Sequence, residues 1–230
     1  MATTDPSGPE QVSMASAADT SQLVSDRAHR LRWWALAVLN GGLLVITLDT
    51  TILNVAVPAL VKSLGASMGD LQWIIDGYTL VFACLLLTAG ALGDRFGRKG
   101  ALQGGLVVFA LASLASSLST STGQLVIARG FMGLGAAFIM PSTLSLLTNL
   151  FRDPRERARA IGLWAAVGGA SGALGPVLGG LLLRWYSWHS VFLINIPIIA
   201  VLLVAGHVIL PTSKAPHAPR LDPVGAGLSM

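Results

Sequence analysis

Long apolar runs alternate with short polar segments along most of this chain. Each run has about 20 residues or more, the length that an α-helix needs to cross the hydrocarbon core of a bilayer. The segments between them are short, so consecutive helices should be antiparallel neighbours in one bundle. The runs cover residues 34–58, 71–92, 101–119, 124–150, 160–183 and 190–210. We therefore expect an all-α membrane protein, with a bundle of six transmembrane helices over residues 31–211.

The two ends of the chain lack such runs. Residues 1–30 are rich in Ser, Thr, Ala and Asp and have little to bury, which predicts a disordered tail. The first apolar run follows several arginines and is long enough to span, so it is interpreted as a retained helix rather than a cleaved signal peptide. Residues 212–230 are polar and Pro-rich at their start, and we expect them to form a linker.

The composition agrees with a protein solvated mainly by lipid. Hydrophobic residues make up 53% and charged residues only 11%, and the mean hydropathy is +0.69; a soluble domain carries about 25% charged residues. The basic residues lie at the edges of the runs and not on a face with stacking aromatic residues, which argues against nucleic-acid binding. Cys84 is the only cysteine, so no internal disulfide or thiolate metal cluster can form, and no metal is expected.

The basic residues also predict the orientation of the helices. Lys62 and Arg184 fall on one side of the predicted bundle, and Arg129 falls within a run. Cytoplasmic connections carry the excess of Lys and Arg, so the richer side is cytoplasmic. Both ends of the chain are then expected in the cytoplasm, in a multi-pass protein of the plasma (inner) membrane. The basic residues on that side are Arg27, Arg30, Arg32, Arg95, Arg98, Lys99, Arg152, Arg155, Arg157, Arg159, Lys214 and Arg220.

Asp49, Asp76 and Arg129 are charged residues inside the predicted spans. By helical rise, Asp76 and Arg129 lie about 8 Å below the outer surface and Asp49 about 14 Å below it, so they could share one cavity. Burial favours the neutral form of a carboxylate, as a proton site requires. Two structural alternatives remain: an Asp49 carboxylate satisfied by the hydroxyls of Thr50 or Thr51, and an ion pair with Arg129 that serves stability alone.

The connection between the second and third runs, Gly90–Lys99, concentrates charge in a tight turn. Asp94, Arg95, Arg98 and Lys99 would be very costly in hydrocarbon, so the segment should lie in water. Its glycines suit a sharp reversal of the chain. A faint copy of the pattern follows the fifth run at residues 179–189. If runs 1–3 and 4–6 are equivalent, they form two inverted three-helix repeats.

The fifth run is rich in small residues. Ser171, Gly175 and Gly179 recur at intervals of four, as do Gly168 and Gly172, and this spacing lets helix backbones approach closely.

A motif in the same run raises the alternative hypothesis that the protein is a serine protease. Gly169-Ala170-Ser171-Gly172 matches the Gly-x-Ser-Gly of intramembrane serine proteases, with His207 as the available base. Their expected depths from the cytoplasmic edge, about 16 Å and about 6 Å, are too different for a nucleophile and base that must lie about 3 Å apart. We therefore expect no enzyme.

Several of these segments together resemble a known family. Gly90–Lys99 is similar to the signature cytoplasmic loop of the major facilitator superfamily. Leu48–Pro58 resembles the first-helix motif of its fourteen-span drug/proton antiporters, and Leu125–Gly135 resembles their fourth-helix motif, whose Arg is tied to proton coupling. Gly175–Gly180 resembles the fifth-helix motif of exporters. Further matches are Trp73, Asp76 and Tyr78 in the second helix and Phe192–Pro197 in the sixth.

The chain departs from the family pattern at three points. Ser171 stands where the exporter motif begins with Gly, and His189 and Ser190 stand where an Arg-Trp pair is more common. Family members also continue with further helices after the sixth. The resemblance therefore implies the N-terminal half of a major facilitator fold, with residues 212–230 leading to a missing C-terminal half.

The resemblance further implies proton-coupled export of small hydrophobic, cationic compounds by alternating access, with the proton gradient as energy source and no cofactor. Alternatives are export of a host-made metabolite or antibiotic, and a remnant that serves only as a membrane scaffold. The implied residues are Asp49, Asp76, Arg129, Asn54 and Tyr78 in the proton and substrate cavity, Gly90, Asp94, Arg95, Gly97, Arg98 and Lys99 in a conformational-switch loop, and Gly175, Pro176, Gly179 and Gly180 in the exporter helix.

Overall fold

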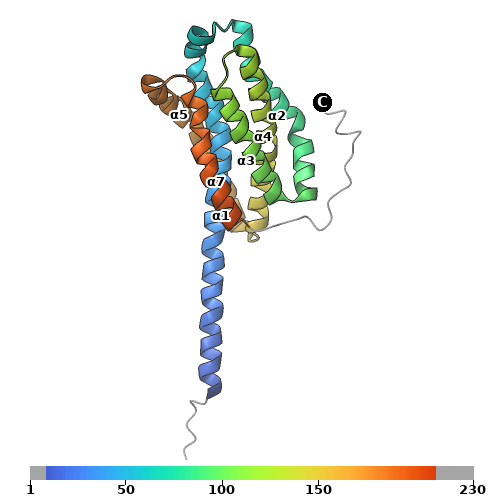
Figure 1. Ribbon diagram of the computed structural model, residues 1–230. Helices are drawn as coiled ribbons and strands as arrows, with labels where there is room; N and C mark the ends of the chain where they lie inside the picture. The colour runs from blue at the N-terminus through green and yellow to red at the C-terminus, as the bar shows by residue number, and fades with distance from the viewer. Residues whose placement is uncertain (1–8, 211–230) are drawn as a thin grey trace, which may run out of the picture.

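The computed structural model describes the backbone of residues 9–210 and the side chains of residues 31–210 (Figure 1). The regular secondary structure of this part is all helical, with short connections and no strand. The helices are α1 (Pro9–Leu64), α2 (Met68–Phe96), α3 (Arg98–Ser117), α4 (Thr122–Leu150), α5 (Pro154–Trp185), α6 (Ser190–Leu193) and α7 (Asn195–Ile209).

Six segments of the described chain are long and apolar enough to cross a membrane, which confirms the predicted all-α bundle. Each coincides with one of the predicted runs to within a few residues; most begin earlier, and the third and sixth end at Ser117 and Ile209, slightly before their runs. The extensions come from capping. Ser67 and Asp70 form a capping box at the start of α2, and Ser121 and Asp153 accept hydrogen bonds from the first turns of α4 and α5. The polar connections are therefore shorter than expected.

The sixth run is the one predicted helix that the structure divides. A turn at Ile194 separates α6 from α7. Pro197 follows three residues later, and its ring nitrogen cannot donate the helical hydrogen bond to the carbonyl of Leu193. The break therefore lies where that bond is missing, and it places Asn195 at the start of α7.

The N-terminal region differs from the expected disordered tail. α1 begins at Pro9, so residues 9–30 continue the first transmembrane helix, which extends beyond the other helices in Figure 1. After Pro9 this stretch has no Gly or Pro, and a helix already nucleated by the span propagates at little cost. Residues 1–8 and the predicted linker 212–230 lie outside the described residues.

The packing of the helices confirms the two inverted repeats. α2 packs mainly on α4, and the equivalent helix α5 packs mainly on α1. α3 packs on α4, just as the α6–α7 pair packs on α1, and α3 contacts α7. If α1, α2 and α3 are exchanged with α4, α5 and the α6–α7 pair, the main packing partners stay the same. This is expected for repeats of opposite orientation. α1 and α4 are equivalent in this exchange.

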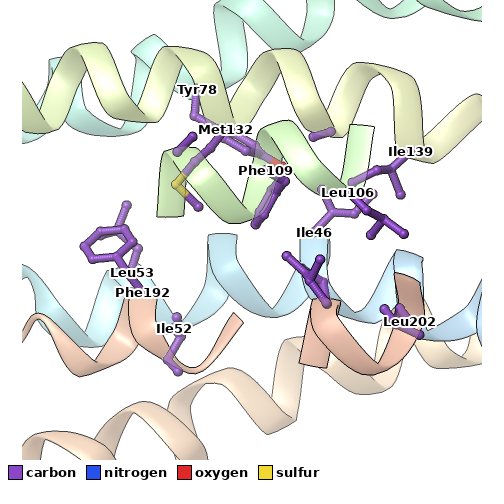
Figure 2. Packing of buried hydrophobic residues seen from close by; sticks show 14 of the residues in the cluster. Ile46, Ile52, Leu53, Tyr78, Leu106, Phe109, Met132, Ile139, Phe192 and Leu202 are labelled. Carbon is purple, nitrogen blue, oxygen red and sulfur yellow. The ribbon is translucent and has the colours of Figure 1, made fainter. Parts of the chain in front are cut away.

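The core of the bundle lies between these helices (Figure 2). Ile46 of α1, Phe109 of α3, Met132 of α4 and Phe192 of α6 are all buried and point into it. The most apolar stretch of α4 has 56% of its residues buried, whereas those of α2 and α5 have only 17%. α4 is thus the central helix of the described bundle, and α2 and α5 expose wide apolar faces.

α3 and α4 cross at two glycines. A Cβ atom added to Gly105 would lie 2.8 Å from the carbonyl oxygen of Gly135, and one added to Gly135 would lie 2.8 Å from the carbonyl oxygen of Gly105. Neither backbone can yield without moving its helix. The side chain of Phe109 fills the space beside this crossing, with none of its surface exposed.

Replacing Gly135 by Ala should therefore destabilise the bundle by about 1–3 kcal/mol, the usual effect of overpacking. Gly104→Ala is the matched control, because Gly104 is exposed on the same α3 and a Cβ there would meet open space. The measurement is the free energy of unfolding of both variants in lipid bicelles. Equal stability of the two variants would contradict the tight crossing.

Candidate functional site

An ion pair between Asp49 of α1 and Arg129 of α4 lies inside the bundle. Arg129 Nη1 donates to Asp49 Oδ2, and each residue has only 1% of its surface exposed. Removing one partner would leave a buried, uncompensated charge, which is strongly destabilising. The two residues lie on the equivalent central helices of the two repeats, so the pair joins the repeats at the middle of the bundle.

α2 provides two further contacts to the Arg129 guanidinium. Arg129 Nε donates to the carbonyl oxygen of Ile74 over 3.2 Å. The guanidinium carbon lies 4.4 Å from the centre of the buried Tyr78 ring, in a cation–π contact. A planar guanidinium can make a hydrogen bond, an ion pair and a stacking contact at once, and an ammonium group cannot.

α7 provides the partner of the second carboxylate oxygen, and α3 in turn contacts that partner. Asn195 Nδ2 donates to Asp49 Oδ1 over 3.2 Å and to Ser113 Oγ over 3.0 Å, and Ser113 Oγ donates to the carbonyl oxygen of Phe192 over 3.0 Å. Asn195 and Ser113 are fully buried. We call Asp49, Arg129, Asn195 and Ser113 the buried polar network.

Sequence reasoning did not single out Asn195 and Ser113. Asn195 carried a usable signal, because it is an amide inside the most hydrophobic span of the chain. Ser113 carried none, since single serines are common in transmembrane helices and usually bond to their own helix backbone.

Two other predicted cavity residues lie outside the network. Asp76 is half-buried on α2 and takes no part in the ion pair, and Asn54 is exposed and donates to the carbonyl oxygen of Thr50 over 3.4 Å. The hydroxyls of Thr50 and Thr51 also donate to backbone carbonyls, so they do not satisfy Asp49. The structure thus brings Asp49, Arg129 and Tyr78 together and leaves Asp76 and Asn54 apart.

The network permits a simple piece of acid–base chemistry. A proton bound to Asp49 would cancel the carboxylate charge and with it the electrostatic attraction between α1 and α4. Arg129 would keep its contacts to Ile74 and Tyr78 on α2. Within residues 31–210, no three His, Cys, Asp or Glu side chains are grouped as metal ligands.

The predicted tight turn between α2 and α3 is confined to Gly97, because the rest of the Gly90–Lys99 loop belongs to the last turns of α2 and the first turn of α3. Gly97 ends α2 with φ +121°, a conformation that other residues rarely adopt. Asp94 Oδ1 accepts from Arg98 Nε over 2.6 Å and from Ser145 Oγ of α4 over 3.4 Å. The loop is therefore attached to the second repeat.

Lys99 extends the attachment of this loop to α7. Its Nζ donates to the carbonyl oxygens of His207 and Leu210, each over 2.7 Å, and these carbonyls belong to the end of the helix. An ammonium group is favourable there because the C-terminal end of a helix carries partial negative charge. Arg95, by contrast, is exposed and its guanidinium lies 5.6 Å from the Phe96 ring centre.

A cavity of about 470 Å³ opens beside the loop, between α2, α4 and α5. Its wall is largely apolar, and Asp94 and Trp164 line it together with Gly90 and Pro141. Gly90 lies in ordinary contact with Pro141, where an added Cβ would be 3.5 Å from the proline Cβ.

The exporter-helix residues divide between two faces of α5. Gly175 and Gly179 are buried against α1; a Cβ on Gly175 would overlap the side chain of Thr51, and one on Gly179 would lie 2.9 Å from Ile52. Pro176 and Gly180 are exposed on the other face, and a Cβ on Gly180 would meet open space. Of these four residues, only Gly175 and Gly179 take part in the close approach of α1 and α5.

Ser171 belongs to the same buried face. Its carbonyl oxygen accepts from Thr51 over 3.2 Å, and its hydroxyl donates to Val167 within α5. His207 is exposed in the last turn of α7. The serine hydroxyl is therefore occupied within its own helix, with no hydrogen bond to His207 in the described chain.

The family model of the Major Facilitator Superfamily matches residues 39–226. The methylenomycin A resistance protein of Bacillus subtilis is 45% identical over 196 residues, which are 85% of this chain and 42% of the relative. The tetracenomycin C resistance and export protein of Streptomyces glaucescens is 44% identical over 188 residues, 82% of this chain and 35% of the relative. The methyl viologen resistance protein SmvA of Salmonella typhimurium is 44% identical over 172 residues, 75% and 35% respectively.

A solved structure shows the same fold. It is a bacterial homologue of the human lysosomal transporter Spinster in an inward-facing, unoccupied conformation, with a TM-score of 0.64 and 19% identity, covering 84% of this chain and 45% of that one. The chain thus spans less than half the length of the relatives that it matches. From the family match over most of its length, the shared fold and the named relatives, the chain belongs to the major facilitator superfamily, whose members are membrane transporters and not enzymes.

Proposed function

We propose that the chain forms the N-terminal half of an exporter that moves small hydrophobic, cationic compounds out of the cell in exchange for protons. The observation that carries the proposal is the buried Asp49–Arg129 ion pair between the two repeats, in a chain related to resistance and export proteins. A buried carboxylate whose one charged partner is the Arg129 guanidinium offers a site whose charge a proton can switch. The methyl viologen resistance relative supports cationic substrates, because methyl viologen is a dication.

Proton coupling follows from linkage between two binding events. If a proton and a cationic substrate each favour a different charge state of Asp49, each lowers the affinity for the other, by the same factor. Protons from outside would then promote release of substrate, and substrate from inside would promote release of protons. Arg129 and Tyr78 would hold the carboxylate in place, and Asp76 and Asn54 would contribute to the substrate cavity that the second half completes.

The loop and α5 would control the exchange of conformations. The contacts of Asp94 with Arg98 and Ser145 and those of Lys99 tie one end of α2, α3, α4 and α7 together, so they would stabilise one arrangement of the bundle. The exposed faces of α2 and α5 would receive the second half of the transporter. In this proposal both ends of the chain lie in the cytoplasm, in the plasma membrane.

Export of a host-made antibiotic is the second candidate. The tetracenomycin C resistance and export relative favours it. The two candidates differ in the charge of the substrate, so competition against the export of ethidium, a cationic dye, separates them. Inhibition by other cations alone supports the first candidate, and stronger inhibition by neutral or acidic antibiotics supports the second.

Replacing Asp49 by Asn should abolish export driven by a pH gradient, because the amide keeps the size of the side chain but cannot bind a proton. The measurement is ethidium transport in inverted membrane vesicles that contain this chain with its second half. Ethidium binding should be weaker and independent of the protonation of this site, because the neutral amide resembles the protonated carboxyl group. Asp70→Asn is the control, because it removes a carboxylate from the capping box at the other end of α2 from the loop. This variant should transport normally. Full pH-driven export by Asp49→Asn would disprove the proton site.

Those vesicles also separate the scaffold alternative from the proposal. A wild-type protein that inserts normally, yet moves no substrate at any pH gradient, would be a scaffold and not an exporter.

Replacing Gly175 by Ala should lower the export rate about tenfold, because the added methyl group pushes α1 away from α5. Gly180→Ala, in the same motif but facing open space, should retain the wild-type rate. Both are compared by initial rates at equal amounts of inserted protein. Equal rates would show that the close contact of α1 and α5 does not limit transport.

A further inference from the structure

Asn195 occupies an unusual position in the buried polar network. Its Nδ2 donates two hydrogen bonds, to Asp49 and to Ser113, while its Oδ1 is buried without a hydrogen-bond partner in the described chain. Leaving a buried acceptor unpaired costs free energy, and such groups in folded proteins call for an explanation. An amide that served only to fill space would be replaceable by an apolar side chain of the same shape.

The chemistry of the amide provides such an explanation. A carboxylate only accepts hydrogen bonds, whereas a carboxylic acid also donates one through its O–H group. The amide of Asn carries a donor and an acceptor on one group that rotates about χ2. The orientation in the structure, with Nδ2 toward Asp49 Oδ1, fits the carboxylate. The rotated orientation, with Oδ1 in that place, fits the acid.

We infer that Asn195 is a positioning residue for the protonation of Asp49, which it senses by rotating its amide. The inference rests on the proposed role of Asp49 as the proton site. In the ion-paired state Nδ2 donates to the carboxylate. When a hydronium ion from the outer aqueous side transfers its proton to Asp49, a carboxylic acid and water are formed, and the new O–H donates to the rotated Oδ1.

Ser113 makes both orientations possible. Its hydroxyl now accepts from Nδ2 and donates to the carbonyl oxygen of Phe192. After rotation the same hydroxyl can donate to Oδ1, since a hydroxyl both donates and accepts. Oδ1 is unpaired in the present orientation, and Nδ2 would be unpaired in the rotated one. The amide itself therefore favours neither orientation strongly. The charge on Asp49 then decides which orientation is populated.

The surroundings of Asp49 contain few other groups that could respond to pH. Arg129 faces it from α4, and Tyr78 of α2 lies against the Arg129 guanidinium. The contacts from α3 and α7 are the neutral Ser113 and Asn195. On the α5 side, α1 meets the neutral Ser171 backbone through Thr51. Among these described neighbours, Asn195 is the neutral group that touches the carboxylate directly.

Infrared difference spectroscopy of the 230-residue chain in lipid nanodiscs, recorded between alkaline and acidic pH, tests the inference. The carboxyl band that disappears in Asp49→Asn reports protonation of Asp49. Asn195→Leu removes the donor of the carboxylate and the acceptor of the acid. Because a hydrogen bond to a charged group is the stronger of the two, the midpoint of this band should rise by about one pH unit. Its frequency should also move toward that of an acid without a hydrogen-bond acceptor.

Two further variants make the test specific. Ile196→Leu, at the neighbouring half-buried position of α7, should leave the midpoint and frequency unchanged. Ser113→Ala keeps the amide but removes the hydroxyl that holds it, so it should shift the midpoint in the same direction by a smaller amount. Ser113→Ala carries the test alone if Asn195→Leu does not insert.

The outcomes distinguish the inference from the proposal beneath it. A titrating Asp49 band with the same midpoint and frequency in the Asn195 and Ser113 variants as in the wild type would overturn the role of Asn195 only. The absence of any band that depends on Asp49 would overturn the proton site itself and the inference with it.

Discussion

The free-energy cost of placing charge inside a bilayer shapes the centre of this molecule. Each of Asp49 and Arg129 alone would cost about 2.5–3.5 kcal/mol at the middle of a span. Together they form an ion pair, and contacts from α2, α3 and α7 satisfy most of the remaining polar atoms around it. The two charges therefore require several helices to pack at one point, and they fix how α1 lies against α4.

The inverted repeat explains why this pair can be formed at the centre. α1 and α4 are equivalent helices of opposite direction, and each passes through the middle of the bundle. A carboxylate on one and a guanidinium on the other meet where the repeats face each other. The glycine contacts of α3 with α4 and of α5 with α1 hold the other helices close to this central pair. The central ion pair and the glycine contacts around it thus hold the same set of helices together.

The Gly90–Lys99 loop is joined to the rest of the bundle by specific polar contacts. Asp94 reaches Ser145 of α4, and Lys99 reaches the last carbonyls of α7. These contacts lie at the opposite end of α2 from its capped start at Ser67, and they join that end of α2 and α3 to α4 and α7.

Hydrophobic patterning alone predicted the six spans, because a segment in hydrocarbon must satisfy its own backbone and only a long apolar helix does so. It also singled out Asp49, Arg129 and the loop charges, since a charge within or between spans is costly wherever the helices lie. The patterning could not show which of these charged residues contact one another, because helical rise gives the depth of a residue but not which helix faces meet. Asp76 was therefore grouped with Asp49, and Asn195 was overlooked. The division between Gly175 and Gly180 likewise depended on which side of α5 packs on α1. Those contacts join residues 80 to 146 positions apart, and only tertiary packing decides them.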